Sequence, residues 1–461
     1  MKRTPEIRTL EQAGAYLEGL INVEKERSVP YARFDLEPIR RLTARLGDPQ
    51  RALSVIHIAG SKGKGSTALF TESLLRASGE RVGTFTSPHL SRWTERFRID
   101  GVEVDGDTLA AAVDRVAPHV DAQRESDPAH APTFFDATAA VALLLFRDAD
   151  VDRAVLEVGL GGRLDSTNVV SPELCCITSI ELEHTEQLGD TLAEIAAEKA
   201  GIVKPGVPVV MGLLAREAAR VVEERSRELN APLARLGHDF AVEVVSEDLD
   251  GQMLHLIDGP IDTHLRIPVL GRHQAHNAAL ALACARRVSK LSDAAICDGL
   301  RAAQLPGRIE LLGRSPWLIV DSAHTATSAA ALAEVVRAVP RRRAHLVVSI
   351  SAGKAAGSIL SSLVPGVDSV TVTRAEPIRS LAPTEVAAAI RAIDPSLPVS
   401  IVPNPHLAVR AALEPLGSND LLCVTGSIYL AGIARAILTE SPGAGRVEVS
   451  RGNGAGPDGD G

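Results

Sequence analysis

Short apolar runs alternate with longer segments of helical periodicity through most of this 461-residue chain. The apolar runs are rich in Val and Ile and end in glycine or polar residues, as buried strands do. Each is followed by a segment whose apolar residues recur three and four positions apart. Two helical stripes, at 10–20 and 36–46, come first and predict a helical N-terminal segment over residues 1–50. The alternation predicts an α/β fold built on a parallel sheet.

The same pattern places the individual elements. Strands are expected at 55–58, 81–86, 153–158, 174–180, 207–211, 317–320, 345–350, 369–373, 399–402 and 420–424. Helices are expected at 66–78, 106–123, up to 146, from 191 through 199, at 216–229, in the run GRHQAHNAALALACARRV, at 292–308 and at 329–338, with a polar β-rich segment to 267.

A break near Pro306 and Gly307 divides the pattern, because the alternation of strands and helices restarts after it. We therefore predict an N-terminal domain at 1–307 and a second, smaller α/β domain at 308–440. Residues 441–461 are poor in apolar residues and rich in glycine, which predicts a disordered tail.

Composition narrows the classes of protein that fit this pattern. Aromatic residues make up only 3% of the chain, so the core must be built from Ala, Val, Leu and Ile. The net charge of -9, without a long basic run, gives no support for binding nucleic acid. The five cysteines lack C-x-x-C spacing and mostly lie in apolar runs, as reduced core cysteines of cytosolic proteins do. With no signal peptide and no apolar run of about 18 residues, we expect a cytoplasmic protein without membrane contact.

One glycine-rich turn carries the strongest chemical signal. The run SVIHIAGSKGKGST spans 54–67 and contains Gly60, Lys62, Gly63, Lys64, Gly65, Ser66 and Thr67. A tight turn between a buried strand and a helix start presents N–H groups that hold anionic oxygens. Its spacing is shorter than the usual G-x-x-x-x-G-K-[ST] pattern. We expect Lys64 to neutralise the β and γ phosphates of ATP while Ser66 or Thr67 faces magnesium. The alternative is a solvated turn, and Lys62 is interpreted as a solvated lysine.

Polar residues also stand at or near the ends of other predicted strands, where doubly wound sheets bind their ligands. Ser87 is a candidate magnesium ligand, with an ordinary turn residue as the alternative. Glu157 lies inside a β-branched run, and a buried carboxylate is costly unless it is paired or bound to metal. A magnesium ligand is the simplest explanation for Glu157, and a salt bridge is the alternative.

His184 and Lys199 follow the strand predicted at 174–180. Taken singly, each fits a structural or solvated role better than a catalytic one. An ammonium group cannot ligate a cation, so Lys199 serves a metal site only if its amine is neutral or chemically modified. The polar segment 90–135 ends in PTFFD and suggests a substrate lip, although solvated charges and a core Phe134 or Phe135 explain it equally well.

Several motifs, taken in order, resemble those of folylpolyglutamate synthase and dihydrofolate synthase, which are ATP-dependent amide ligases related to the Mur ligases. The resemblance covers about 36–435 and rests on GDPQ, HIAGSKGKGST, TSPHL, ERFRIDG, AVLEVGLGGRLDSTN, ITSIELEHTEQLGDTLAEIAAEKAGIVKPG, GRHQAHNAALALA, LPGRIE, DSAH and VTGSIYLAG. It implies a central ATP-binding domain with a phosphate loop and a Rossmann-like C-terminal domain that binds the amino acid.

The resemblance also implies a role for each matching residue. The ATP phosphates would be held by Gly60, Gly63, Lys64, Gly65, Ser66 and Thr67, and the rest of ATP would be lined across the domain cleft by Asn277, Arg308, Asp321 and His324. Two magnesium sites are implied, one with Ser87 and Glu157 as ligands and the other with His184 and a carbamylated Lys199. Catalysis would rest on Lys64, His184 and Lys199, and the pterin-bearing substrate would be faced by Phe135, Arg163 and Asp165.

The implied reaction joins L-glutamate to a folate or pteroate carboxylate. ATP would convert the carboxylate into an acyl phosphate, which the amine of glutamate then attacks, and we expect the enzyme to be a monomer. The chain departs from the family pattern at Ser61, Lys62, Glu183, Ser322 and Thr325, and SISAGKAAGS keeps only Lys354 of an Asp-containing motif.

Because of these departures, a paralogous ligase that joins a different acid and amine is the alternative. A phosphate-loop NTPase or a nucleotide-binding module is the rival from another class. A cell-wall Mur ligase is disfavoured, because no domain of about 100 residues precedes the loop.

Overall fold

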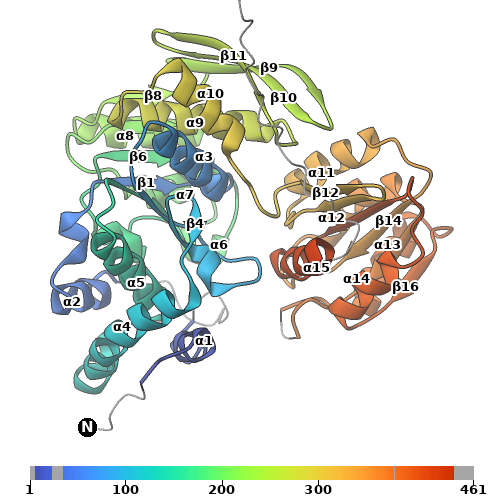
Figure 1. Ribbon diagram of the computed structural model, residues 1–461, viewed down its shortest axis with the longest axis horizontal. Helices are drawn as coiled ribbons and strands as arrows, with labels where there is room; N and C mark the ends of the chain where they lie inside the picture. Colours follow the sequence, from blue (N-terminus) through green and yellow to red (C-terminus); the bar gives the residue numbers. More distant parts are fainter. Residues whose placement is uncertain (1–5, 23–34, 378, 441–461) are drawn as a thin grey trace, which may run out of the picture. The chain divides into compact units, whose positions relative to one another are not determined.

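The computed structural model describes residues 6–22, 35–377 and 379–440 (Figure 1). The tail predicted at 441–461 and parts of the helical segment predicted at 1–50 lie outside these residues. The chain divides between Pro306 and Gly307 into two compact units, called unit 1 and unit 2 below. Each unit is described by itself.

Unit 1 is built on an eight-stranded sheet with the order β4-β3-β2-β5-β1-β6-β7-β8. Its strands are β1 (Val55–Ala59), β2 (Val82–Phe85), β3 (Phe97–Ile99), β4 (Val102–Glu103), β5 (Arg153–Glu157), β6 (Leu174–Ile177), β7 (Val209–Met211) and β8 (Leu233–Arg235). Strands β2, β5, β1, β6, β7 and β8 run parallel, and the edge strands β3 and β4 pair antiparallel. The predicted α/β fold with a parallel sheet is confirmed.

The helices of unit 1 cover both faces of this sheet. They are α1 (Leu10–Glu18), α2 (Glu37–Arg45), α3 (Lys64–Ala77), α4 (Gly106–Ser126), α5 (Phe134–Asp148), α6 (Thr185–Leu188), α7 (Leu192–Ala200), α8 (Arg216–Glu228), α9 (His273–Val288) and α10 (Asp293–Ala302), with short turns η2 (Pro49–Ala52), η3 (Trp93–Arg96), η4 (Pro128–His130) and η5 (Ser166–Val169). Because side chains alternate along a strand, Val55 packs with α5 on one face while Ile56 and Ile58 pack with α3 and α9 on the other.

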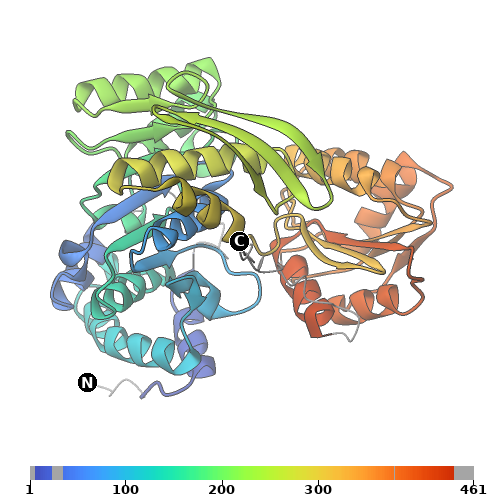
Figure 2. The ribbon, with the colours of Figure 1, turned by 45° about the horizontal axis from the view of Figure 1, so that its top comes forward.

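An antiparallel three-stranded sheet also belongs to unit 1 and is seen as long ribbons in Figure 2. It has the order β11-β10-β9, formed by β9 (Phe240–Asp248), β10 (Gly251–Asp258) and β11 (Ile261–Ile267). Its inner side chains, such as Leu254 and Leu256, join the core that contains α3 and α9. This sheet is the β-rich segment expected before residue 267.

Helix α3 is held tightly because its neighbours present small side chains. Helix α9 buries a run of alanines from Ala275 to Ala285. Helix α10 approaches so closely at Gly299 that a β-carbon there would lie 2.7 Å from Leu74 Cα. A core packed at this density leaves α3 little freedom to shift, so the loop at its N-terminus has a fixed support.

Unit 2 is a second α/β unit, as predicted. Its six-stranded sheet has the order β12-β13-β17-β14-β15-β16, with β12 (Glu310–Arg314), β13 (Trp317–Val320), β14 (Ala344–Val348), β15 (Ser369–Val372), β16 (Val399–Ile401) and β17 (Leu421–Thr425). The helices are α11 (Ala326–Ala338), α12 (Ala356–Leu363), α13 (Pro383–Ile393), α14 (Pro405–Leu413) and α15 (Ile428–Glu440), with the turn η6 (Val364–Gly366). All strands run parallel except β12, which pairs antiparallel with β13.

Some predicted bounds were wrong for identifiable reasons. The strand expected at 174–180 ends at Ile177, because the chain there leaves the sheet to contact the glycine-rich turn. The helix expected at 292–308 ends at Ala302, since Ala303 is already extended ahead of Pro306. Strands β3, β4, β8 and β12 were not predicted, and each has only two to five residues. Among the described residues, no helix combines the length and the apolar character needed to cross a membrane.

Candidate active site

The glycine-rich turn joins β1 to α3 in unit 1, as the sequence predicts. Gly63 precedes the first helical residue with a φ of 83°, a conformation that favours glycine. A β-carbon at Gly63 would collide with Asn277 Oδ1 of α9, and one at Gly60 would collide with Thr178 Oγ1. The turn is therefore pressed between the end of β6 and the start of α9, which only glycine permits at these two positions.

Residues after β6 anchor the turn through hydrogen bonds. Thr178 Oγ1 donates to Lys62 O over 2.6 Å, and the Lys62 amide donates to Ser179 Oγ over 2.8 Å. Ser61 Oγ accepts from the Glu181 amide at 2.9 Å. Ser61, where the chain departs from the family pattern, thus ties the loop to the adjacent strand end.

Three lysines meet around one carboxylate and one carbonyl group. Lys64 Nζ and Lys199 Nζ each donate to Gly60 O over 3.0 Å. Lys199 Nζ also lies 3.1 Å from Glu183 Oε1, and Lys62 Nζ lies 3.3 Å from Glu183 Oε2. The structure therefore brings Lys199 of α7 to the glycine-rich turn, and Lys62 is paired rather than simply solvated.

Burial sets the protonation tendencies of this cluster. Lys199 is only 2% exposed, and burial lowers its pKa to about 8, although the Glu183 charge acts in the opposite direction. Burial alone would raise the pKa of Glu183, but Lys199, Lys64 and Lys62 outweigh it and lower that pKa to about 2. Glu183 is thus ionised at neutral pH, while Lys199 loses its proton far more readily than a surface lysine.

Glu183 and His184 stand side by side after β6. The sequence identified His184 as a site residue and treated Glu183 only as a departure from the family pattern. His184 is exposed at the start of α6 with a φ of 48°, and its charge contributes to the lowered pKa of Glu183. The signal for Glu183 was present in the sequence, because a carboxylate at a strand end beside a lysine-rich loop is a natural ion-pair partner.

Glu157 ends β5 and faces the same turn. Its side chain is buried, it accepts a hydrogen bond from the Ser87 amide at 2.9 Å, and a β-carbon at Gly65 would lie 3.2 Å from Glu157 Oε2. Thr67 Oγ1 is buried as well and has no hydrogen-bond partner within the described part of the chain. The glycine-rich turn thus has a buried carboxylate, Glu157, with the backbone of Ser87 beside it, and Thr67 at the start of α3 adds a hydroxyl that is unpaired among the described residues.

This donor set fits magnesium better than a metal held by protein ligands alone. Across residues 6–22, 35–377 and 379–440 there is no group of three or more His, Cys, Asp and Glu side chains that could hold a metal ion. Magnesium commonly uses one or two carboxylates together with substrate phosphates and water. The Glu157 carboxylate and the Thr67 hydroxyl at the glycine-rich turn fit this mode of magnesium binding.

Asn277 lies beside the glycine-rich turn within unit 1. It is buried near the start of α9, where its Nδ2 donates to Gln274 Oε1 over 2.9 Å while Oδ1 faces Gly63. The structure thus brings Asn277 to the residues predicted to hold the phosphates.

The residues predicted to face a pterin are differently placed. Asp165 is buried, and its carboxylate accepts from the amides of Gly159, Leu160 and Thr167 at 2.9 to 3.0 Å and from the Thr167 hydroxyl. Burial raises the pKa of Asp165 to about 6. These bonds make Asp165 a brace for the turn at 159–167, so its contact with substrate stays a prediction.

Phe135 packs against this braced turn, and Arg163 belongs to the turn itself. The Phe135 ring packs 5.9 Å from the Phe85 ring and over Gly159, where a β-carbon would collide with it. Arg163 is half exposed and pairs with Glu198 of α7 at 2.8 Å. Arg163 is therefore the member of the predicted set most open to a ligand.

His57 in the middle of β1 is a residue that the sequence analysis missed. Its Nε2 lies 2.8 Å from Thr167 Oγ1, whose single proton goes to Asp165. His57 must then donate from Nε2, and its buried Nδ1 has no partner among the described residues. Complete burial lowers the pKa of His57 to about 3, so the ring is neutral. The signal was one polar residue inside the apolar run VIHIA.

Unit 2 gathers its predicted residues around the end of β13. Asp321 is buried and accepts from the amides of Ile309 and Ala323 at 2.8 and 2.7 Å, and burial raises its pKa. Arg308 bonds the Ser322 hydroxyl, and His324 Nδ1 lies 2.8 Å from Ser322 O. Ser322, a departure from the family pattern, thus links Arg308 to His324.

Thr325, the other departure in unit 2, has a structural role. It begins α11 by accepting from the Ser328 amide in a capping box. Hydroxyl caps of this kind stabilise a helix by about 1 kcal/mol, which accounts for the residue without any role in binding.

Family comparisons extend over most of the chain. The model of the Mur ligase middle domain matches residues 58–285, and that of the Mur ligase glutamate ligase domain matches 307–428. A dihydrofolate synthase/folylpolyglutamate synthase of Bacillus subtilis is 33% identical over 411 residues, covering 86% of this chain and 94% of that protein. A probable bifunctional folylpolyglutamate synthase/dihydropteroate synthase of Halobacterium salinarum is 37% identical over 87% of this chain, which spans only 49% of that protein. The chain spans about half the length of its Haloferax volcanii counterpart too.

Solved structures agree with the sequence comparisons. Mycobacterium tuberculosis folylpolyglutamate synthase complexed with ADP and AMPPCP superposes with a TM-score of 0.85 at 32% identity, covering 94% of this chain and 99% of that one. A bifunctional folylpolyglutamate synthase/dihydrofolate synthase with Mn, AMPPNP and L-glutamate bound gives 0.80 at 31%, covering 95% and 100%. The likeness in sequence and fold therefore extends over both units of the chain. The chain belongs to the folylpolyglutamate synthase and dihydrofolate synthase family, within the Mur ligases.

Proposed function

We propose that this protein is an ATP-dependent amide ligase that adds L-glutamate to the carboxylate of a folate or a dihydropteroate. The carboxylate is first activated by the γ-phosphate of ATP as an acyl phosphate, and the glutamate amine then displaces phosphate. The observation that carries the proposal is the convergence of Lys64, Lys199 and Glu157 on one glycine-rich turn. The nucleotide, metal and glutamate bound by the relatives named above support the same reaction.

Each residue at the turn has a proposed task. The turn amides and Lys64 bind the β and γ phosphates, where a positioned ammonium favours charge on the transferring group. Ser87, Glu157 and Thr67 hold a magnesium ion, which supplies charge stabilisation to the phosphates when bound. Asn277 positions the loop, and Arg308, Asp321 and His324 of unit 2 are assigned to nucleotide binding by the family resemblance.

Lys199 is proposed to carry a carbamate that completes a second magnesium site with His184. Carbon dioxide reacts only with a neutral amine, and a pKa of about 8 leaves a substantial neutral fraction near pH 8. The carbamate converts an ammonium into an anionic oxygen donor, which a hard cation accepts. Glu183, 3.1 Å from the amine, then needs Lys62 as its remaining ion-pair partner.

The substrate-binding residues, the cellular compartment and the oligomeric state are also part of the proposal. Phe135, Arg163 and the turn braced by Asp165 are assigned to the pterin-bearing acid, and unit 2 is assigned to the amino acid. All five cysteines are free and four of them are buried, which suits a reducing compartment. We propose a monomer that works in the cytoplasm.

The experiment that tests this function is ADP release by the purified full chain with MgATP. Dihydropteroate and tetrahydrofolate are supplied separately, each with and without glutamate, and product mass is the readout. Release that needs both the acid and glutamate, with a glutamyl mass added, supports the ligase. Lys64→Ala is expected to abolish ligation and phosphate release together, and near-normal turnover by this variant would contradict the phosphate role of Lys64.

The rival functions give different results in the same assay. A phosphate-loop NTPase releases ADP without acid or amine. A nucleotide-binding module binds ATP but releases no ADP under any condition. If neither acid leads to ADP release although ATP still binds, the protein is a paralogue that joins another acid and amine.

A further inference from the structure

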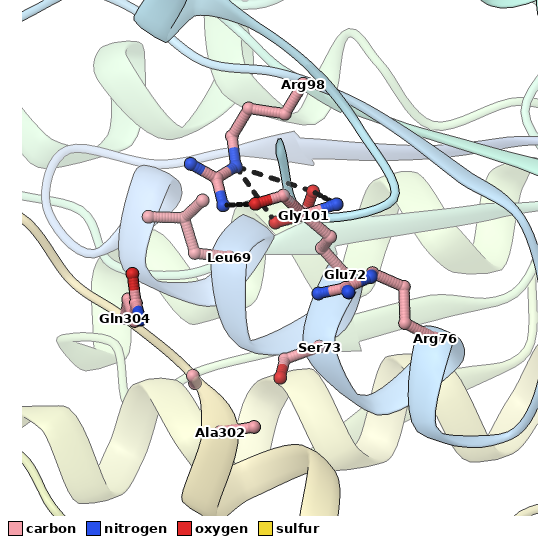
Figure 3. Close-up of a pocket in the computed structure, with 9 residues that line it drawn as sticks. Leu69, Glu72, Ser73, Arg76, Arg98, Gly101, Ala302 and Gln304 are labelled. Atoms are coloured by element: carbon pink, nitrogen blue, oxygen red, sulfur yellow. Dashed lines mark hydrogen bonds and ion pairs between the residues drawn. The ribbon is translucent and has the colours of Figure 1, made fainter. Parts of the chain in front are cut away.

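A polar cavity lies in unit 1 along α3, the helix that begins at the glycine-rich turn (Figure 3). Its volume is about 230 Å³, and its walls come from one face of α3, the turn between β3 and β4, and the segment after α10. Arg76 of α3 lies one helical turn after Glu72 and Ser73, so its side chain is next to theirs on the helix surface. Arg76 stands 12 residues after Lys64, about 18 Å along the helix, so this cavity is distinct from the phosphate loop.

Two residues of opposite charge in the cavity wall, Glu72 and Arg98, already form an ion pair with each other. Glu72 is buried and accepts from the Gly101 amide at 3.0 Å and from Arg98 Nε at 3.2 Å. Arg98 Nη2 donates to Gly101 O, as the dashed lines in Figure 3 show. Both Glu72 oxygens therefore have donors within the wall, and the charges of Glu72 and Arg98 cancel.

Arg76 supplies the excess positive charge. It is exposed and forms no hydrogen bond with any residue that the structure describes, while its guanidinium lies against Gly101. A β-carbon at Gly101 would collide with Arg76 Nη1, and the φ of Gly101 is 76°. Glycine at this turn is thus what lets the guanidinium lie over the backbone at the mouth of the cavity.

The groups left to meet a ligand are mostly hydrogen-bond donors. They are the guanidinium of Arg76, the remaining Arg98 nitrogen and the side-chain amide of Gln304. The Ser73 hydroxyl is already used, because it donates to Gly299 O over 2.6 Å. A guanidinium fork matches the oxygens of phosphate or carboxylate, and a cavity this small excludes a nucleotide.

We propose that this cavity binds a small oxyanion, of the phosphate or carboxylate class, through Arg76, Arg98 and Gln304. The bound anion contacts α3, the β3–β4 turn and the segment after α10 at once, and so links three segments that line the cavity. This site is separate from the proposed nucleotide site and does not depend on the ligase function.

Equilibrium dialysis with labelled inorganic phosphate tests the proposal. Saturating MgADP is included to fill the phosphate loop, and the full chain is compared with Arg76→Gln and Arg76→Lys. Arg45→Gln is the matched control, because Arg45 is also an exposed arginine in the last turn of a helix. We expect one phosphate site in the wild type and in Arg45→Gln, at least tenfold weaker binding in Arg76→Gln, and an intermediate value in Arg76→Lys, which keeps the charge without the fork.

Competition with glutarate distinguishes the two anion classes. Displacement of phosphate by glutarate marks a general oxyanion site, and its absence marks a phosphate site. If MgADP fails to bind, the titration is repeated without it, and Arg76→Gln should still remove one site while leaving the other. A wild type without a site beyond the phosphate loop, or equal binding by Arg76→Gln and Arg45→Gln, overturns the proposal.

Discussion

Gly63→Ala is expected to weaken both folding and nucleotide binding. Alanine at the observed φ of 83° costs about 1–2 kcal/mol, because its β-carbon approaches the neighbouring carbonyl oxygen. The new β-carbon would also lie well inside van der Waals contact with Asn277 Oδ1, so Asn277 must move and lose its 2.9 Å bond to Gln274. Leaving that buried amide unpaired costs about 1–3 kcal/mol more. The sum is about 2–5 kcal/mol.

Gly79→Ala provides a matched control at the other end of the same helix. Gly79 follows α3 with a φ of 93°, and a β-carbon there would meet no atom within 4 Å. Its replacement should therefore cost only the backbone part, about 1–2 kcal/mol. The difference between the two variants isolates the close approach of the turn to Asn277.

The assay is urea unfolding of both variants, together with calorimetric titration by MgADP. We expect Gly63→Ala to be the less stable variant and to bind MgADP at least tenfold more weakly than Gly79→Ala. Equal unfolding free energies would show that Asn277 relaxes without cost. Unchanged MgADP binding by Gly63→Ala would refute the inference that the turn must hold its observed conformation to bind phosphates.

Three further predictions concern buried titratable groups. Lys199→Ala should lose ligation and regain part of it with acetate; no rescue, with no carbamate mass on the wild type, would contradict carbamylation. The pKa of His57, about 3 against 6.5 unfolded, gives stability that is complete above pH 6.5 and lost as pH falls toward 3. Wild type should lose about 1.6 kcal/mol more unfolding free energy than His57→Gln between pH 6.5 and 5, and parallel losses would refute this. Hydrogen bonds from Arg342 and Gly417 lower the pKa of Asp420, so the stability advantage over Asp420→Asn should shrink below about pH 4, which acid titration of the melting temperature would measure.

The parts of the fold that the sequence predicted are those whose signal is local. The run VIHIA and the glycines that follow it define a strand and a turn within fifteen residues, and the structure has both at that place. The edge strand β4 has two residues, too few for any periodicity to show. Strand β12 pairs antiparallel at the sheet edge, where polar residues are tolerated and the apolar pattern weakens.

In the candidate site too, the residues that the sequence predicted are those with a local signal. Lys64 and Glu157 could be identified from the strand and turn that carry them. The ion pair of Lys199 with Glu183 could not, because it depends on how α7 packs beside β6. Asp165 shows the opposite case, since its position in the motif indicates substrate while four donors of its own turn occupy the carboxylate. Long-range packing, which no local pattern encodes, decides the ion pair, whereas the local hydrogen bonds of the turn at 159–167 decide the role of Asp165.

The carbonyl oxygen of Gly60 has a further consequence for how the turn receives its ligand. It accepts Lys64 Nζ at 3.0 Å, so the free protein already holds this side chain in one place. A free lysine gives up about 2 kcal/mol of rotamer entropy when it is fixed. Here much of that loss is incurred during folding, so the phosphate that we propose for this turn would replace one acceptor of Lys64 with another. Without a ligand, the carbonyl oxygen of Gly60 thus takes the place of a phosphate oxygen and keeps the Lys64 side chain ordered.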